Sequence, residues 1–344
     1  MDKFSYYLQK IIGKKNNTDI YNANGVLLVP KSFIITYDHV MLLEENGITL
    51  TEEAVTDIGT FTNADYNEYY KLIDEAVEET SRIFKEIRRN RKIPLAELRK
   101  DVIPLIQNVS ENTNVLQLFV ALQAKDDYTY RHNIAVGALA NLIGNWMNLD
   151  HQALMQLTTA ALLHDVGKML ISESILNKPG KLTDEEYAIM KKHTIYGYEI
   201  LNDTVGISHR QALVALQHHE RMNGSGYPMG IKRDNIDLFS RIVAVADIFH
   251  AMTSNRVYRT HSPFYEVLTE MEEEMFGELD PEITLVFIEK TMNYLIGCSV
   301  LLTDGRIGTI IMVPKNKPTR PLIKVGEQFI DLTKESQIHI ERII

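Results

Sequence analysis

Seven imidazole and carboxylate side chains in a long helical stretch have the types and the spread of a metal site. They are His132, His164, Asp165, His193, His218, His219 and Asp247. They fall on successive predicted helices or helix ends, and helical bundles build metal sites from ligands distributed in this way. Imidazole and carboxylate donors without thiolates favour Fe, Mn or Zn. A carboxylate that bridges two such cations is how many enzymes hold a metal pair for hydrolysis of phosphate esters.

The segment "LLHDVGK" (162–168) puts a polar cluster at the end of an apolar helix. Lys168 follows His164 by four residues and Asp165 by three, so one helix face presents all three groups to a common pocket. Gly167 removes a side chain beside them. Burial of such a cluster is costly unless a partner or a cation satisfies it, which indicates a binding site.

A second segment, "ALVALQHHERMNGSGYP" (212–228), also ends an apolar helix in polar groups and then enters a glycine-rich loop. Its His218 and His219 point about 100° apart on a helix and could serve two adjacent metals. Isolated histidines are more often capping or surface residues, and five are interpreted in that way: His39, His151, His209, His261 and His339. The combination of a His-Asp pair, a downstream His, a His-His pair and the Asp that closes "RIVAVAD" is hard to produce by chance. It indicates a metal site.

Composition limits the class of protein. The 344 residues include 36 basic and 46 acidic side chains, which gives a net charge of −10. Binding to DNA, RNA or an anionic membrane is therefore not expected, and an anionic ligand must meet locally positive groups. The single Cys298 excludes an internal disulfide and suits a reducing compartment. Because no apolar run approaches the ~20 residues needed to span a bilayer, a cytoplasmic protein without membrane insertion is expected.

The elements that must position the ligands predict a mainly α protein with four parts. Residues 1–62 carry short β-like runs and read as a small N-terminal α/β domain. Residues 63–125 form a helical linker region whose long helix is acidic early and basic late, as the helix dipole favours. Residues 126–295 are almost all helical and hold the candidate ligands, so they are predicted to be the catalytic domain. Residues 296–344 predict a C-terminal β extension, a small antiparallel sheet or barrel.

Several helix starts follow from short local patterns. Capping boxes are predicted at 183–186 and 208–211, where Thr or Ser precedes Glu or Gln by three residues. The pairs at 262–263 and 280–281 place an N-cap residue before a proline at the first helical position.

With these motifs in view, the block 126–290 resembles an HD-GYP domain, the branch of HD-type phosphohydrolases that degrades the bacterial second messenger cyclic di-GMP. The similarity covers about half of the chain and rests on "LLHDVGK", "ILNKPGKLTDEEYAIMKKHTIYG", "HHERMNGSGYP", "SRIVAVADIFHAMTSNRVYR" and "LDP". It implies a helical HD-type bundle used in signal transduction. It also implies that the seven residues named above are ligands of two, sometimes three, Fe or Mn ions.

The resemblance also implies which residues bind substrate. Lys168, Arg256 and Arg259 are expected to contact the phosphates, and Tyr227 of the Gly-Tyr-Pro loop to lie beside the pocket. These cations and the metals would create the positive pocket that a doubly charged cyclic dinucleotide requires. A metal-bound hydroxide is expected to attack phosphorus, with Asp165 and Lys168 as the catalytic residues. The expected product is linear pGpG, which some family members cut again to GMP.

Two positions near the ligands depart from the family pattern. Tyr128 stands one helical turn before His132, where members with a third metal have Glu, so two divalent ions are expected. His250 stands where Asp is common, three residues after Asp247 on the same helix face. It is interpreted as a supporting or packing residue rather than as an additional ligand.

Two alternative functions stay open at this point. One is an HD-type hydrolase of another nucleotide, and the other is a catalytically weak regulator that binds a cyclic dinucleotide. The complete ligand set argues against the second, because a site released from catalysis has no physical reason to keep seven buried polar groups. The expected partners are cyclic di-GMP or a related nucleotide, a second copy of the chain in a homodimer, and signalling proteins docked at the Gly-Tyr-Pro loop.

Overall fold

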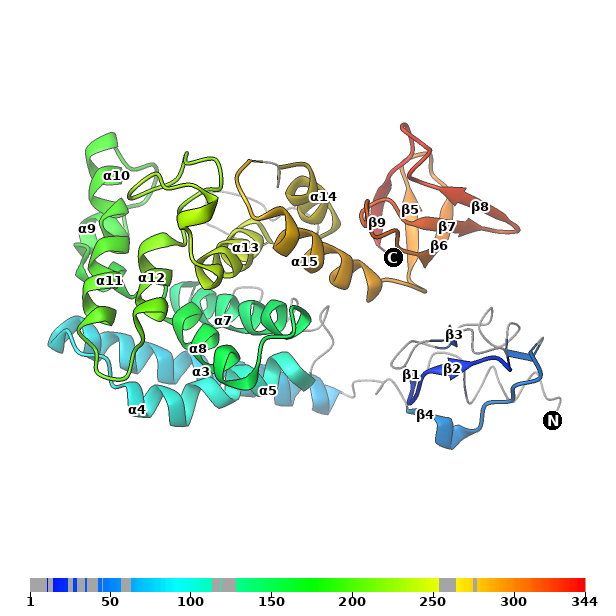
Figure 1. The fold of residues 1–344 in the computed structure, drawn as a ribbon, viewed down its shortest axis with the longest axis horizontal. Coiled ribbons are helices and arrows are strands. Elements are labelled where there is room, and N and C mark those ends of the chain that lie inside the picture. Colours follow the sequence, from blue (N-terminus) through cyan, green and yellow to red (C-terminus); the bar gives the residue numbers. More distant parts are fainter. Residues whose placement is uncertain are drawn as a thin grey trace. The chain divides into compact units, whose positions relative to one another are not determined.

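The computed structural model describes residues 11, 15–23, 27–29, 35, 43–44, 46–56, 63–112, 118, 128–253, 264–274 and 277–343 (Figure 1). The chain divides into two compact units, Met1–Glu68 and Tyr69–Ile344. Among the described helices, none combines the length and the apolar character needed to cross a membrane.

The N-terminal unit contains short antiparallel strand pairs. β1 (Lys15–Asn16) pairs with β4 (Val55–Thr56), β2 (Ile20–Tyr21) pairs with β3 (Leu27–Val29), and the 3-10 turn η1 (Glu52–Ala54) precedes β4. Their small core consists of Ile11, Val29, Ile35, Leu43, Leu50 and Val55. One of the β-like runs of this region, at 33–43, lies mostly outside the described residues. The expectation of short β structure at this end is confirmed.

Helices dominate the chain from residue 63 to residue 293. They are α3 (Asn63–Asn90), α4 (Leu95–Glu97), the π-helical turn η2 (Leu98–Val102), α5 (Ile103–Asn112), α7 (Tyr128–Trp146), α8 (His151–Leu162), the 3-10 turn η3 (Val166–Leu170), α9 (Glu173–Leu176), α10 (Asp184–Lys191), α11 (His193–Asn202), α12 (His209–Gln217), the 3-10 turn η4 (Arg233–Asn235), α13 (Leu238–Thr253), α14 (Phe264–Glu274) and α15 (Pro281–Asn293). The long helix predicted in the linker region is present as α3.

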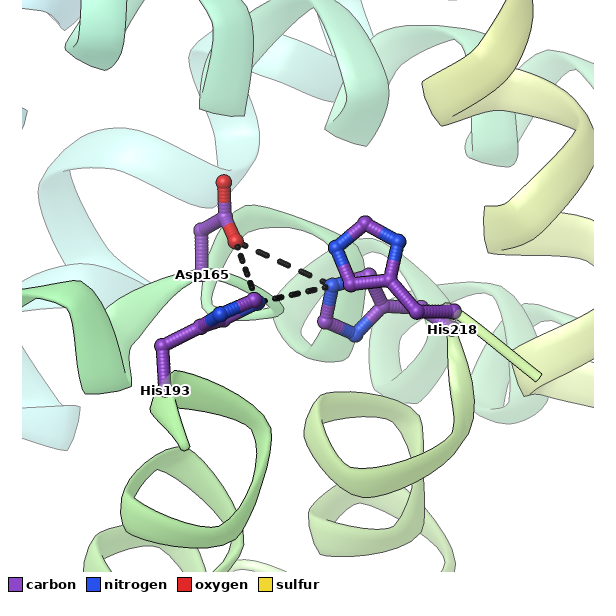
Figure 2. A group of neighbouring side chains, drawn as sticks. Asp165, His193 and His218 are labelled. Atoms are coloured by element: carbon purple, nitrogen blue, oxygen red, sulfur yellow. Dashed lines mark hydrogen bonds and ion pairs between the residues drawn. The ribbon is translucent and has the colours of Figure 1, made fainter. Parts of the chain in front are cut away.

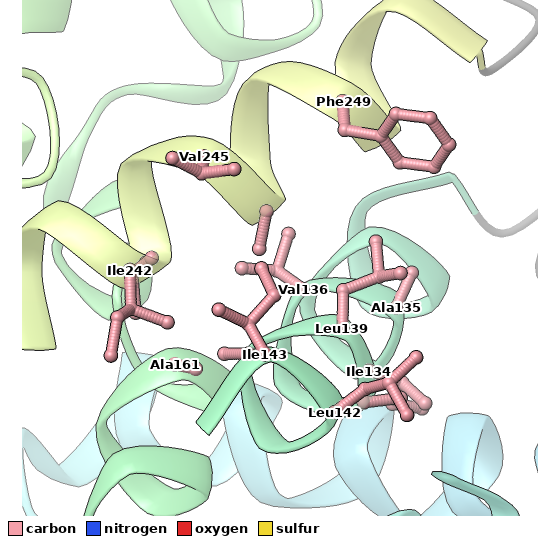
Figure 3. Packing of buried hydrophobic residues seen from close by; sticks show 14 of the residues in the cluster. Ile134, Ala135, Val136, Leu139, Leu142, Ile143, Ala161, Ile242, Val245 and Phe249 are labelled. Atoms are coloured by element: carbon pink, nitrogen blue, oxygen red, sulfur yellow. The ribbon is translucent and has the colours of Figure 1, made fainter. Parts of the chain in front are cut away.

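Helix α7 lies at the centre of the larger unit and packs against α5, α8, α13 and α15. Every residue from 131 to 144 is buried, so this helix has no solvated face to orient it. Figure 3 shows Val136, Leu139 and Ile143 of α7 opposite Ile242 and Val245 of α13. Each such aliphatic side chain contributes about 1.5–3 kcal/mol on full burial. This packing fixes α7 and α13, which carry two of the candidate ligands.

The C-terminal strands form one five-stranded antiparallel sheet. The strands β5 (Ser299–Leu302), β6 (Ile307–Met312), β7 (Leu322–Val325), β8 (Gln328–Asp331) and β9 (Ile340–Ile343) lie in the order β8-β7-β6-β5-β9. Val300, Ile310 and Ile323 of this sheet belong to the same buried core as the helices. The Tyr265 hydroxyl of α14 donates a hydrogen bond to the carbonyl of Thr319. The sheet is therefore packed on the helical bundle rather than tethered to it.

Local cap signals place helix starts where the sequence predicts them. Helices α10 and α12 each begin with a capping box in which both reciprocal hydrogen bonds are present. Asp280 accepts hydrogen bonds from the amides of Glu282 and Ile283 at the start of α15, where Pro281 is the first helical residue. The predicted start at 262–263 lies outside the described residues. The predicted fold class, mainly α with small β structures at both ends, is confirmed.

Candidate metal centre

His164 and Asp165 lie in a tight turn between α8 and η3, and Gly167 sets the depth of this turn. A Cβ on Gly167 would lie 1.9 Å from the carbonyl oxygen of His193 and 2.4 Å from the amide nitrogen of Gly197. Only glycine permits backbone segments to approach so closely. The first turn of α11 therefore packs directly on η3, which brings His193 to Asp165.

The seven predicted ligands converge in the larger unit. Six of them form two groups in which all ligand atoms lie within 4.8 Å of one another: Asp165 with His193, His218 and His219, and Asp165 with His132 and His164. Asp165 is common to both groups. Asp247 lies beside the second, with its Oδ1 atom 3.1 Å from Nε2 of His132. Figure 2 shows Asp165, His193 and His218 directed toward one another from separate chain segments.

Backbone carbonyls orient three of the imidazoles. Nδ1 of His164 lies 2.7 Å from the carbonyl of Ala161, and Nδ1 of His193 lies 2.7 Å from the carbonyl of Met190. Nδ1 of His218 lies 3.0 Å from the carbonyl of Val214. A carbonyl can only accept, so each Nδ1 must carry the proton. In the neutral ring, Nε2 then bears the lone pair that a metal requires.

The space around Asp165 has an excess of lone pairs. Nε2 of His193 is 3.3 Å from Oδ1 of Asp165 and 3.5 Å from Nε2 of His218. Nε2 of His218 is 3.7 Å from the same Oδ1 atom. That buried oxygen has no hydrogen-bond partner among the described residues. Since neutral rings held by Nδ1 have no proton to place between these atoms, the cluster fits a cation better than a hydrogen-bond network.

His132 is oriented by a side chain instead of a carbonyl. Its Nδ1 atom lies 2.9 Å from Nδ1 of His250, so one ring donates a hydrogen bond to the other. Both residues are buried. His250 thus touches the side of His132 that faces away from Asp247. This geometry fits the supporting role predicted for His250.

Both carboxylates are held in the ionised form. Burial opposes ionisation of Asp165, but Lys168 and His164 outweigh it and hold the pKa of Asp165 well below its usual range. Burial also opposes ionisation of Asp247. The hydrogen bond from His132 is the largest of the interactions that outweigh burial and bring the pKa of Asp247 well below its usual range. These two carboxylates therefore carry negative charge at neutral pH.

Most of the imidazoles are held neutral. Burial lowers the pKa of His193 to about 4 and that of His219 to about 3. Burial also lowers the pKa of His132, and that of His218 falls well below its usual range. At His164 burial acts in the same direction, but the adjacent Asp165 outweighs it and raises the pKa. Ionised carboxylates with neutral imidazoles are the protonation state in which such residues bind divalent ions.

A loop after α12 covers one side of the centre. The buried Glu220 anchors it, because its carboxylate accepts hydrogen bonds from the amides of Met229 (2.7 Å) and Ile231 (3.1 Å). The ring of Tyr227 lies 4.6 Å from that of His219, at an interplanar angle of 30°. Burial raises the pKa of the Tyr227 hydroxyl well above its usual value, so this phenol stays neutral.

The remaining predicted residues divide into two sets. Lys168 forms an ion pair with Oδ2 of Asp165 and keeps about a quarter of its side chain exposed, at 26%. Arg256 and Arg259, predicted to bind phosphate, lie outside the described residues, as does the side chain of Tyr128. Sequence reasoning missed Glu220, although its position directly after the His-His pair was a usable signal.

Comparisons with known proteins agree with this geometry. A family model described as "HD domain" matches residues 108–283. A cyclic di-GMP phosphodiesterase of Pseudomonas aeruginosa is 33% identical over 265 residues, which cover 74% of this chain and 64% of the relative. A cyclic di-GMP phosphodiesterase of Thermotoga maritima is 42% identical over 167 residues, which cover 48% of this chain and 45% of the relative. The chain thus spans less than two thirds of these relatives.

A solved structure shares the fold. An HDG"Y"P protein from Bdellovibrio bacteriovorus superposes with a TM-score of 0.51 at 18% identity, and the match covers 81% of this chain and 96% of that one. At this level of identity the likeness concerns the arrangement of helices alone.

Proposed function

This chain belongs to the HD domain family, and on that premise we propose that it is a metal-dependent phosphodiesterase that hydrolyses cyclic di-GMP. The curated relatives support its membership in the HD-GYP branch, as the sequence motifs predict. The observation that carries the proposal is the sharing of Asp165 between two groups of potential ligands. A shared carboxylate is what a two-metal phosphodiester hydrolase requires.

We propose that the seven converging residues hold two divalent ions. Asp165 would bridge them, with His193, His218 and His219 on one side and His132, His164 and Asp247 on the other. The donor set of imidazoles and carboxylates without thiolate supports Fe or Mn. When bound, such ions lower the pKa of water and stabilise negative charge on a phosphoryl group.

The protein's own groups would position the phosphate. Lys168 is ion-paired with Asp165 and partly exposed. Its ammonium can therefore stabilise the negative charge of a non-bridging phosphate oxygen while it stays at the centre. Arg256 and Arg259 are proposed to bind the second phosphate of a cyclic dinucleotide, on the motif "SNRVYR" alone. Tyr227 stays neutral and would contact the substrate without attracting or repelling charge. The proposed product is pGpG, with GMP as the product of a second cut.

The test is metal-dependent turnover. Anaerobically purified protein, loaded in turn with Mn(II) and Fe(II), is incubated with cyclic di-GMP, and the products are resolved by chromatography. Linear pGpG or GMP should appear only with metal, and Asp165→Asn, checked for folding by circular dichroism, should form neither. Turnover of another cyclic dinucleotide in place of cyclic di-GMP would support the alternative specificity. Tight binding without turnover in the metal-loaded protein would support the regulator.

We also propose the four-part division at 62, 125 and 295, a cytoplasmic location and two protein contacts. The Gly-Tyr-Pro loop is proposed to dock signalling proteins, since Met229 on this anchored loop is 52% exposed. A homodimer is proposed as well. Light scattering on the intact chain measures whether it is a dimer. The same measurement on Met229→Ser separates the two proposals, because a residue that docks a partner leaves the mass of the chain's own assembly unchanged.

A further inference from the structure

A corner formed by two tyrosines and a lysine lies beside the candidate metal centre and has no role in ligating metal. Tyr187 and Lys191 are four residues apart on α10 and so share one helix face. The rings of Tyr187 and Tyr227 lie 6.5 Å apart at 76°. The Lys191 ammonium lies 5.1 Å from the centroid of Tyr187 and 5.8 Å from that of Tyr227.

This corner is continuous with the metal centre. Tyr227 lies 4.6 Å from His219 and 6.4 Å from His193, measured between ring centroids. A row of ring contacts therefore leads outward from the proposed ligands to Tyr187. A nucleotide whose phosphate is held at the centre can extend along this row.

Exposure distinguishes Tyr187 from a core aromatic. It is 47% exposed, although it contacts the ring of Tyr227 and the ammonium of Lys191. An exposed aromatic ring forgoes the stabilisation that burial would give. Such rings are a common platform on which nucleobases stack, whichever base it is. A lysine at the rim of such a platform can donate to the O6 and N7 acceptors of guanine, while the amino group of adenine presents a donor there.

We propose that Tyr187, Tyr227 and Lys191 form a base-binding corner in which a purine stacks on Tyr187 and Lys191 favours guanine over adenine. This deepens the proposed function, since it rests on a nucleotide phosphate at the metal centre. Tyr187 and Lys191 are then specificity residues, which act on substrate binding and leave the metal ligands in place.

The experiment measures how much the base adds to binding. The Mn(II)-loaded full-length protein is titrated calorimetrically with GMP, AMP and ribose 5-phosphate. GMP should bind more tightly than ribose 5-phosphate by about 5- to 150-fold, the range of one stacked base. Tyr187→Ala should remove most of this ratio, and Tyr187→Phe should retain it. Lys191→Met should reduce the preference for GMP over AMP.

The matched control is Ile189→Ala. Ile189 lies on the same helix, is 39% exposed, and points to nearly the opposite side because it is two residues from Tyr187. The ratio should be unchanged in this variant. Metal content and Tm are measured for every variant, so that a folding defect is recognised.

Three results would overturn the corner. They are equal binding of GMP and ribose 5-phosphate by the wild type, no binding of either, and equal losses in Tyr187→Ala and Ile189→Ala. Failure of the proposed function gives a different pattern. Cyclic di-GMP would then survive incubation with the metal-loaded wild type while the ratio between GMP and ribose 5-phosphate and its dependence on Tyr187 remain.

Discussion

The contact between η3 and α11 makes Gly167→Ala an informative perturbation. The added Cβ would meet the backbone of His193 at 1.9 Å and that of Gly197 at 2.4 Å, whereas Cβ contacts below 3.0 Å essentially do not occur. Both obstacles are backbone atoms, so no side-chain rotation relieves the overlap, and α11 must move by about 1 Å. Overpacking costs about 1–3 kcal/mol, and a backbone obstacle places this variant at the upper end.

The expected effects are a loss of stability and a loss of metal binding. At about 2–4 °C per kcal/mol, the upper end of that cost lowers Tm by roughly 6–12 °C. The same movement takes Nε2 of His193 away from Asp165, which it approaches to 3.3 Å, so Mn(II) bound per chain should fall. Thermal unfolding followed by circular dichroism measures the first effect, and elemental analysis after gel filtration measures the second.

A matched control is available in Gly137→Ala. Its Cβ would meet only ordinary contacts, the nearest being a side-chain carbon of Ile106 at 3.5 Å. Because alanine favours helix, this variant of α7 should be neutral or more stable by up to about 1 kcal/mol. The reasoning is refuted if Gly167→Ala has the Tm and metal content of Gly137→Ala.

Three further predictions concern supporting residues. His250→Ala removes the hydrogen bond that orients His132 and should weaken metal binding about 10- to 100-fold in a calorimetric titration; an unaltered affinity contradicts the supporting role. Because His250 is buried, its truncation should also lower the Tm of the metal-free protein. Glu220→Gln replaces one accepting oxygen by an NH2 group, which faces one of the two loop amides, and should lower the free energy of unfolding by about 1–3 kcal/mol. The urea midpoint should fall and the loop should be cleaved faster by a protease; equal cleavage of wild type and variant contradicts this prediction. Ser208→Ala removes the cap of α12 and should lower stability by about 1 kcal/mol in urea, an effect that Ser208→Asp should not show.

Local features of the fold were predictable because they depend on neighbours in sequence. The caps of α10, α12 and α15 each involve residues within three positions of one another, so the pattern contains both partners. The Asp304-Gly305 pair likewise predicts the turn between β5 and β6, where Gly305 has φ +83°.

The composition of the site was predictable for a different reason. Buried polar residues at the ends of apolar helices need compensation, so His164, Asp165 and His218 could be singled out before their positions were known. Their grouping around Asp165 required the fold, because the two groups of ligand atoms come from α7, the turn between α8 and η3, α11 and the residues directly after α12.

The supporting contacts could not be predicted. The carbonyls of Ala161, Met190 and Val214 orient imidazoles, but every residue has a carbonyl and its use leaves no mark in the sequence. The approach of Tyr187 to Tyr227 depends on how α10 packs beside a loop 40 residues away in the chain. Neither hydrophobic period nor motif spacing contains that information.

The double use of Asp165 also constrains how such a protein can diverge. A chain with separate carboxylates for each metal position could lose one position by a single substitution and keep the other. Here a change at residue 165 removes a donor from both groups at once, so we expect it to impair both metal positions together. A descendant with a single ion is accessible through the unshared ligands. Natural variants of this chain should therefore accumulate substitutions at His193, His218 and His219, or at His132, His164 and Asp247, before any at Asp165.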